Sequence, residues 1–332
     1  MNDRLAWLSR TVEAVIDPDL PICDPHHHLW EFPDNRYLLD EFLGDVAGHR
    51  IERTVFVECE QKYRQTGPVE LRPVGETEFV HQITAALHED AARTKVAAGI
   101  VGFADMTLGP AVQDVLEAHM NASARFRGIR HATAWDASER IRNAHTDPPE
   151  GLLRQPTFRQ GIERLRDLGL SFDAWLFHPQ IPDVIDLARA FPDLTIVLNH
   201  AGGPLGIGPY AGKREEVFAV WRRNMIDLAP CENVVLKLGG LSMTMSGFGW
   251  HKRELPPGSS ELAAAMQPYF ETCVEYFGTG RCMFESNFPV EQASCSYTIL
   301  WNAFKTLAQH CSSAERSELF HDVAARTYKL ER

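Results

Sequence analysis

The chain has 332 residues, of which 44% are hydrophobic and 23% charged, a composition typical of folded globular proteins. Its 45 acidic residues outnumber the 33 basic ones and give a formal charge of −12. This balance disfavours nucleic acid as a partner, because phosphate binding needs clustered cations. No run of about 18 apolar residues occurs, so we expect no membrane-spanning helix. The seven cysteines include no CxxC pair and indicate reduced thiols in a cytoplasmic protein.

Short β-branched and apolar runs recur along the chain and predict eight strands. They cover residues 22–28, 54–60, 95–103, 126–131, 171–178, 195–200, 233–239 and 281–287. Amphipathic spacing predicts helices between them at 76–89, 110–122, 157–168, 182–191, 214–228, 261–277 and 294–309, with a further helix after Ser313. Residues 1–20 are interpreted as a helical N-terminal extension, and 41–50 is a weak helix candidate.

Alternating strands and helices predict a parallel sheet closed into a (β/α)8 TIM barrel, with extended βα loops and an extra C-terminal helix. An open doubly wound sheet is the rival, but it would place a glycine-rich phosphate turn where this chain has DPHHHLW. No repeat or linker divides the chain, so residues 1–332 are predicted to form one domain. The longest irregular stretches are 135–156 and 241–258, and glycines in the second could hinge a lid.

Histidines recur at predicted strand ends, where a barrel carries its chemistry. The first strand ends with His26, His27 and His28, the fifth with His178, and the sixth with His200. His26 and His28 are two residues apart and so face the same side of the strand. With a third His from a neighbouring strand end they could form a three-nitrogen site for zinc or a similar divalent metal such as manganese. The alternative for these residues is a set of core histidines bonded to backbone groups.

Arginines at the fourth strand are the first candidates for binding substrate. Arg127 and Arg130 flank a glycine, and a guanidinium there could hold a substrate carboxylate in a bidentate pair. The alternative is a salt bridge from one of them to Glu58 or Glu60 across the barrel mouth.

Three further residues are candidates for substrate contact. Lys237 lies in the apolar run VVLKLGG, so its ammonium either binds an anion or pairs with a carboxylate. Tyr37 and Trp250 lie in loops expected near the mouth. Each either covers the ligand or packs within the protein.

Five segments resemble the amidohydrolase-2 family of TIM-barrel hydrolases: DPHHHLW, FRGIRH, AWLFHP, VLNHAGGP and CMFESNFPV. They follow the family order from Ile22 to the AARTYKL segment near the C-terminus. The family includes lactonases of 2-pyrone-4,6-dicarboxylate and of sugars, and the superfamily includes decarboxylases of aromatic acids. The resemblance implies a set of roles: metal ligands at His26, His28 and His178, a metal-binding or water-orienting His200, and anion binding by Arg127 and Arg130.

The chain departs from the family at the eighth strand. A motif like SDWP commonly supplies an Asp there as metal ligand and general base, whereas this chain has Asn287. An amide is hardly basic and cannot take a proton from water at neutral pH. Either Asn287 still ligates or orients water while Glu285, Glu58 or His200 is the base, or a metal acidifies the water enough for a weak base. The third alternative is that hydrolysis has been lost.

We therefore expect a hydrolase that opens a small carboxylated lactone or related cyclic ester in a catabolic pathway. Its candidate catalytic residues are His200, Asn287, Glu285 and Glu58. A metal-dependent non-oxidative decarboxylase and a non-catalytic ligand-binding barrel are the alternatives. The expected partner is an anionic small molecule, with no nucleic acid and no membrane, and the sequence leaves a homo-oligomer open.

Overall fold

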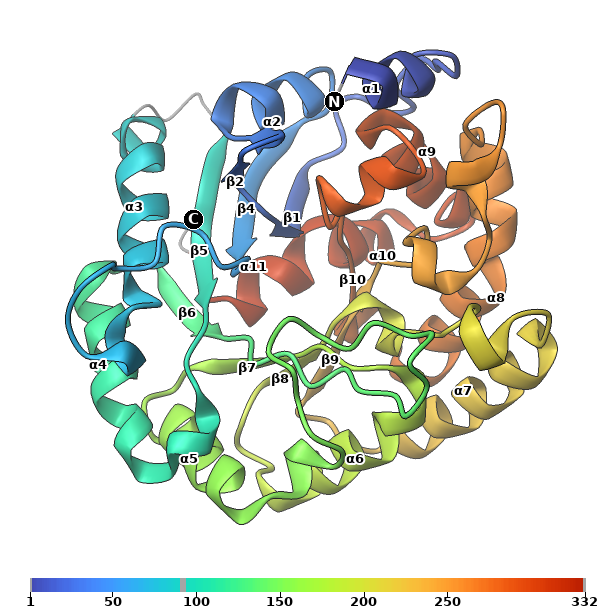
Figure 1. Cartoon of the computed structure of the whole chain (residues 1–332). Coiled ribbons are helices and arrows are strands. Elements are labelled where there is room, and N and C mark those ends of the chain that lie inside the picture. The colour runs from blue at the N-terminus through green and yellow to red at the C-terminus, as the bar shows by residue number, and fades with distance from the viewer. Residues whose placement is uncertain (1, 90–93, 331–332) are drawn as a thin grey trace.

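The computed structural model describes residues 2–89 and 94–330, and its main feature is an eight-stranded parallel sheet. Figure 1 shows the strands in the middle of the molecule with helices around them. In sheet order the strands are β1 Ile22–His27, β4 Ile51–Val57, β5 Lys95–Gly102, β6 Phe126–Ile129, β7 Ser171–Ala174, β8 Ile196–Leu198, β9 Val234–Leu238 and β10 Cys282–Phe284.

Backbone hydrogen bonds just past β10 bring the last strand against the first. Asn287 N donates to His26 O at 2.8 Å, and His28 N donates to Phe288 O at 2.8 Å. These bonds nearly close the sheet on itself, so the predicted TIM barrel is confirmed.

Several strands end earlier than predicted. β6 ends at Ile129 and β7 at Ala174, whereas the apolar pattern extends to residues 131 and 178. In β7 the reason is local, because His178 opens a 3₁₀ turn, His178–Gln180, after the chain has left the ladder. His178 and His200 therefore lie on the first turns of their βα loops, whereas His26 lies within β1.

The predicted helices between strands are confirmed within a few residues at their ends. They are α3 Val74–Glu89, α4 Val112–Ala122, α5 Pro156–Asp167, α6 Ile181–Ala190, α7 Arg214–Leu228, α8 Ser259–Phe277 and α9 Tyr297–Leu307. The weak candidate at 41–50 is a shorter helix, α2 Leu39–Asp45. Short 3₁₀ turns fill many connections: Val69–Leu71, Met106–Ala111, Leu152–Arg154, His200–Gly202, Gly208–Tyr210, Thr244–Ser246, Trp250–Lys252, Thr279–Arg281 and Val290–Ala293.

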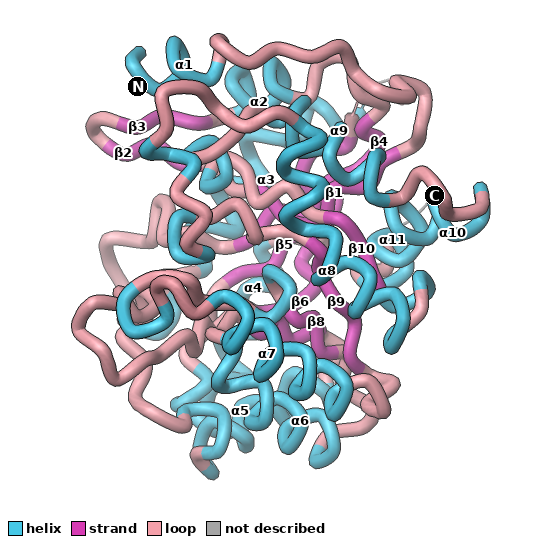
Figure 2. Tube along the Cα trace, turned by 90° about the vertical axis from the view of Figure 1, so that its right-hand side faces the viewer, coloured by secondary structure: helices cyan, strands magenta, loops and turns pink. Residues whose placement is uncertain are grey.

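The N-terminal part differs from the expectation. Of the predicted extension at 1–20, only α1 Asn2–Leu8 is helical, and residue 1 lies outside the described residues. An antiparallel hairpin, β2 Trp30–Phe32 and β3 Asn35–Tyr37, was not predicted. Figure 2 shows α1 and this hairpin on one side of the strands. No helix within residues 2–89 and 94–330 has the length and apolarity to cross a bilayer.

The predicted C-terminal helix is a bent segment that closes the end of the barrel at which the strands begin. It consists of α10 Ser313–Ser317, a π-helical turn Glu318–Asp322 and α11 Val323–Thr327, and Figure 2 shows α10 and α11 opposite the hairpin. Its apolar residues pack on inward-facing strand residues, in a cluster of Cys23, Val55, Val57, Val101, Val197, Met283, Val323, Ala324, Tyr328 and Leu330. The interior at this end is thus a packed apolar core, and the polar groups lie toward the end at which the strands finish.

Replacing Tyr328 by Phe is expected to lower the free energy of unfolding by about 1–3 kcal/mol. The reason is that the Tyr328 hydroxyl donates to Asp173 Oδ2 at 2.8 Å inside the barrel. Urea denaturation measures the loss. Tyr276→Phe is the matched control, because the half-buried Tyr276 hydroxyl accepts one bond from Arg222 at 2.8 Å. Equal losses in the two variants would contradict the assigned role of Tyr328.

Candidate functional site

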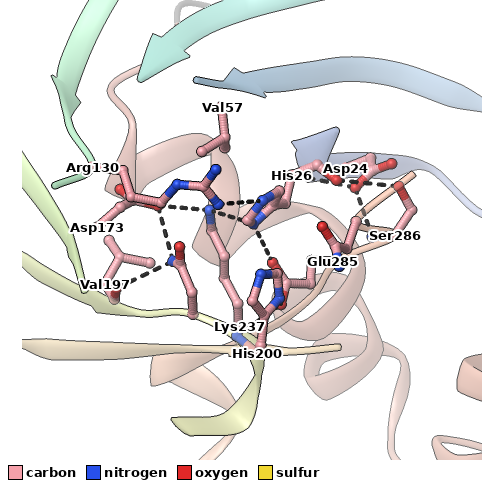
Figure 3. A network of polar contacts seen from close by, with 12 residues as sticks. Asp24, His26, Val57, Arg130, Asp173, Val197, His200, Lys237, Glu285 and Ser286 are labelled. Carbon is pink, nitrogen blue, oxygen red and sulfur yellow. Dashed lines mark hydrogen bonds and ion pairs between the residues drawn. The ribbon is translucent and has the colours of Figure 1, made fainter. Parts of the chain in front are cut away.

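Three potential ligand or acid–base side chains converge at the C-terminal ends of β1, β8 and β10. His26, His200 and Glu285 each offer an atom within 4.8 Å of the others. His26 and Glu285 are fully buried, and His200 is 3% exposed. Figure 3 shows them in one polar network with Arg130 and Lys237. Two histidines and one carboxylate from three different strand ends therefore meet in one place.

The Glu285 carboxylate bridges the two histidines. Its Oε1 accepts from His200 Nδ1 at 2.7 Å and from the His200 backbone N–H at 3.0 Å, and its Oε2 lies 2.7 Å from His26 Nδ1. Two glycines after β9 make this possible. A Cβ on Gly239 would lie 2.4 Å from Glu285 Cγ, and one on Gly240, at φ +70°, would lie 2.4 Å from His200 Cβ.

The partners of the two histidines fix their tautomers. Burial lowers the pKa of both His26 and His200, so both rings are neutral near pH 7. Arg130 Nη1 lies 3.2 Å from His26 Nε2. Lys237 Nζ also lies near Nδ1, at 3.4 Å, but Glu285 Oε2, which can only accept, is closer at 2.7 Å. We therefore assign the lone pair to Nε2 and the proton to Nδ1. His200 likewise directs Nδ1–H at Glu285, and no group in the described part of the chain bonds its Nε2. His200 therefore presents a basic nitrogen.

Arg130 is held at the mouth by Glu58. Its Nε donates to Glu58 Oε1 at 2.7 Å and its Nη2 to the Glu58 backbone oxygen at 2.6 Å. His145, from the loop after β6, lies 3.2 Å from Glu58 Oε2. Burial raises the pKa of Glu58, but Arg130 and His145 outweigh it and lower this pKa to about 2. The expectation that Glu58 is a general base is therefore corrected, because so weak a base is committed to its ion pair.

Lys237 forms a buried ion pair with Asp173. Its Nζ donates to Asp173 Oδ2 at 2.7 Å, and both side chains are fully buried. Asn199 Nδ2 and the Tyr328 hydroxyl donate to the same oxygen at 3.0 and 2.8 Å. Of the two alternatives left by the sequence, the structure shows pairing with a carboxylate. The 3.4 Å approach of Nζ to His26 Nδ1 is an electrostatic contact, since that nitrogen bears a proton.

His28 and Asn287 bond to each other beside the cluster. His28 Nδ1 lies 2.7 Å from Val57 O, and its Nε2 lies 3.3 Å from Asn287 Oδ1. Asn287 Nδ2 lies 3.3 Å from Glu291 Oε1. Both ring nitrogens of His28 are thus engaged within the protein, and the structure does not bring His28 into the three-residue cluster.

The other sequence candidates at this end of the barrel lie apart from the cluster. His178 Nδ1 accepts from Leu205 N at 3.4 Å, and its ring packs on Tyr210 at 5.2 Å between centroids. Tyr37 is buried and donates to Asp45 Oδ2 at 2.7 Å. Trp250 is buried and stacks on Phe248 at 4.4 Å. For Tyr37 and Trp250 the structure shows packing rather than a surface open to ligand.

Arg127 lies at the opposite end of the barrel. It is the second residue of β6, and its Nη1 donates to the backbone oxygens of Ala124 and Phe126 at 2.7 and 2.9 Å. It lines a cavity of about 430 Å³ together with Tyr328 and Lys329. The expectation that Arg127 binds substrate is therefore corrected, since parallel strands place its end of β6 away from the cluster.

Three residues of the site were missed. Asp173 interrupts an otherwise apolar predicted strand, and a charge in that place is itself a signal of a buried partner. Glu291 follows the eighth strand, but its burial depends on a turn that periodicity does not predict. His145 gives no signal in the sequence, because only the path of the 135–156 loop brings it to Glu58.

The cluster fits a divalent metal by the chemistry of its donors. Two imidazoles and one carboxylate form a set used by zinc hydrolases. Glu285 Oε2 is buried and lies 2.7 Å from His26 Nδ1 without hydrogen-bond geometry, so it retains accepting capacity. Glu58 and Asp173 each pair with a cation, whereas Glu285 pairs only with histidines among residues 2–89 and 94–330. The predicted metal set of His26, His28 and His178 thus shares only His26 with the observed cluster.

Comparison with known proteins places this site in a family. The amidohydrolase family model matches residues 23–330. The chain belongs to the amidohydrolase family. Its membership confirms the family resemblance of the sequence and the prediction of a hydrolase.

Individual relatives match over nearly the whole chain. An uncharacterized protein of Sinorhizobium fredii is 34% identical, covering 94% of this chain and 99% of the relative. The L-fucono-1,5-lactonase of Burkholderia ambifaria is 27% identical, covering 93% and 96%. A crystal structure of an amidohydrolase from Burkholderia multivorans with bound zinc has a TM-score of 0.72 at 23% identity, covering 93% and 99%. This last likeness shows the shared fold.

Replacing Lys237 by Met is expected to lower the free energy of unfolding by about 3–5 kcal/mol, because Asp173 would stay buried without its cation. The double variant Lys237→Met/Asp173→Asn is the control and should recover most of the loss. Chemical denaturation of both gives the coupling energy. Wild-type stability in the single variant would show that the ammonium is not needed by Asp173.

Proposed function

We propose that this chain hydrolyses a small carboxylated lactone, adding water across the acyl–oxygen bond of the ring to give a hydroxy acid. The observation that carries the proposal is the His200–Glu285 pair, with an unbonded Nε2, in one network with Arg130. Membership of the amidohydrolase family and similarity to the L-fucono-1,5-lactonase of Burkholderia ambifaria support a lactone, rather than another kind of ester, as the substrate.

In this proposal His200 moves the proton. Its Nε2 takes a proton from water as the water oxygen attacks the ester carbonyl carbon. Glu285 accepts Nδ1–H, keeps the ring in the required tautomer and stabilises the imidazolium. The imidazolium then gives the proton to the ring oxygen as the acyl–oxygen bond breaks. Asn287 takes no proton in this scheme, which accommodates the departure from the family Asp.

Arg130 is the proposed anchor for the substrate carboxylate. A guanidinium has five N–H groups, and the contacts with Glu58 and His26 use three of Arg130's. The remaining two can hold a carboxylate, and the side chain is 8% exposed. Glu58 and His26 fix the guanidinium plane, so an anion would bind in one orientation.

A divalent metal, with zinc as the expected identity, would be held by His26, His200 and Glu285. When bound there, the ion would acidify a water ligand and polarise the ester carbonyl. One nitrogen cannot both bind an ion and accept a proton. The metal content of the protein therefore decides whether His200 Nε2 is a ligand or the base.

Replacing His200 by Gln is expected to lower kcat on the best lactone substrate by about 100-fold or more, because the proton acceptor is lost. A panel of carboxylated and neutral lactones, followed by acid release in a pH-stat, identifies that substrate. His310→Gln, on the exposed surface after α9, is the matched control and should keep full activity. No ring opening of any lactone by the wild type, with or without zinc, would refute the proposed reaction.

Metal content in protein purified without chelator tests which role His200 has: about one zinc per chain, as for a catalytic site with one open position, would make His200 a ligand. His26→Ala should abolish this zinc, because His26 belongs to the cluster. His178→Ala should retain it, because His178 lies apart from the cluster with its Nδ1 at Leu205 N. Elemental analysis measures both. Loss of metal in both variants would return His178 to the ligand set, and metal-free wild type would leave His200 as the base.

A further inference from the structure

The unexplained polar group beside the site is the carboxyl of Glu291. It lies on the 3₁₀ turn Val290–Ala293 just after β10 and is fully buried. Asn287 links it to His28 through two 3.3 Å contacts. We call these three residues, His28, Asn287 and Glu291, the Asn287 bridge.

Donors and acceptors along the Asn287 bridge limit its protonation. His28 Nδ1 must carry a proton, because its partner at 2.7 Å is the backbone oxygen of Val57. A neutral ring then has a lone pair on Nε2, which faces an oxygen of Asn287 at 3.3 Å. Two acceptors cannot bond. Either His28 is an imidazolium, or the Asn287 amide is turned by 180°, so that its nitrogen faces His28; the two ends of an amide are assigned from such networks.

The imidazolium alternative requires a buried charge at each end of the bridge. It pairs a cationic His28 with an ionised Glu291 through a neutral amide, with both charged groups almost completely buried. No ion pair to Glu291 occurs among residues 2–89 and 94–330, and its Oε2 has no hydrogen-bond partner. Charges so placed are costly to bury. The turned amide removes both charges and gives each of the two 3.3 Å contacts of the Asn287 bridge one donor and one acceptor.

We propose that Glu291 is a positioning residue in its neutral acid form: its O–H donates to Asn287 Oδ1, and Asn287 Nδ2 donates to His28 Nε2. Both ends of the Asn287 amide are then occupied, and His28 is fixed with Nδ1–H on Val57 O. Asn287 and Glu291 form one unit, since an Asp at 287 would set a second anion between Glu285 and Glu291. The catalytic consequence rests on the proposed function: the bridge holds the β10–β1 seam that carries His26 and Glu285.

The protonation state is tested by infrared difference spectroscopy between the wild type and Glu291→Gln. A neutral carboxyl gives a carbonyl stretch distinct from that of a carboxylate, and the variant lacks it. Burial raises the pKa of Glu291 to about 8, with Glu285 adding to the effect and bonds from Asn287 and the Ser242 backbone opposing it. The Cys295 thiol is also near, and its own pKa is raised by burial and by Glu291. The band should therefore be present at pH 6 and fade as the pH rises through about 8. Glu13→Gln is the control for specificity: burial raises the pKa of Glu13, but bonds from Ser259 and Asn302 outweigh it and lower this pKa, so the variant should remove no neutral-carboxyl band.

Stability should follow the same protonation. A folded pKa raised from 4.5 stabilises the fold fully only below the unfolded value, and this contribution is lost as the pH rises through about 8. The melting temperature of the wild type should thus fall relative to that of Glu291→Gln between pH 5 and pH 9.

Activity tests the positioning role. The Gln amide can still donate to Asn287, so Glu291→Gln should keep kcat within a few-fold. Glu291→Leu cannot donate and should lose about 10- to 100-fold, as for other groups that orient active-site residues. Absence of the pH 6 band, or equal loss in the Gln and Leu variants, would overturn the proposal. The infrared and melting results do not depend on turnover, so they decide the protonation even if no lactone is hydrolysed.

Discussion

The site depends on one buried carboxylate, which has no cationic side chain as a partner within residues 2–89 and 94–330. Glu285 is fully buried, yet its closest partners are two neutral imidazoles and a backbone N–H. An anion so placed must be stabilised by hydrogen bonds in fixed directions. The surrounding backbone meets this requirement: Gly239 and Gly240 leave room for the side chains, and His200 adopts φ +55° to direct both its N–H groups at the same oxygen.

Two ion pairs lie near Glu285, and in each the two charges are of opposite sign. Arg130 with Glu58 and Lys237 with Asp173 each sum to zero, so neither pair neutralises Glu285. Their cations nevertheless approach the two nitrogens of His26, at 3.2 and 3.4 Å, and together with burial keep that ring neutral. The two ion pairs differ in their remaining contacts. Asp173 of the Lys237 pair also accepts a bond from Tyr328 of the C-terminal segment, whereas Arg130 uses three of its five N–H groups in contacts with Glu58 and His26.

Local patterns in the sequence determine which parts of the barrel and of the site were predictable. Barrel strands and the histidines at their ends were predictable, because apolar runs and their polar ends are local features. The failure at Arg127 has another cause: Arg127 is the second residue of β6 and Arg130 follows its last residue, so the two side chains lie toward opposite ends of the barrel. Which strand-end groups converge was not predictable. His178 and His200 end neighbouring strands, but each enters a different 3₁₀ turn, and only His200 turns toward Glu285.

The amide at position 287 limits the number of ionised carboxyls buried where β10 meets β1. Glu285 and Glu291 lie on either side of Asn287 along the chain, and all three side chains are buried. Burial, with the Glu285 charge adding to it, raises the pKa of Glu291 to about 8, so a further carboxyl placed between them would meet the same cost of ionisation. An Asp at 287 would have to ionise between them to act as a base. With an amide there, the single negative charge of the proposed arrangement stays on Glu285, and the proposed mechanism assigns proton transfer to the ring that Glu285 orients, His200.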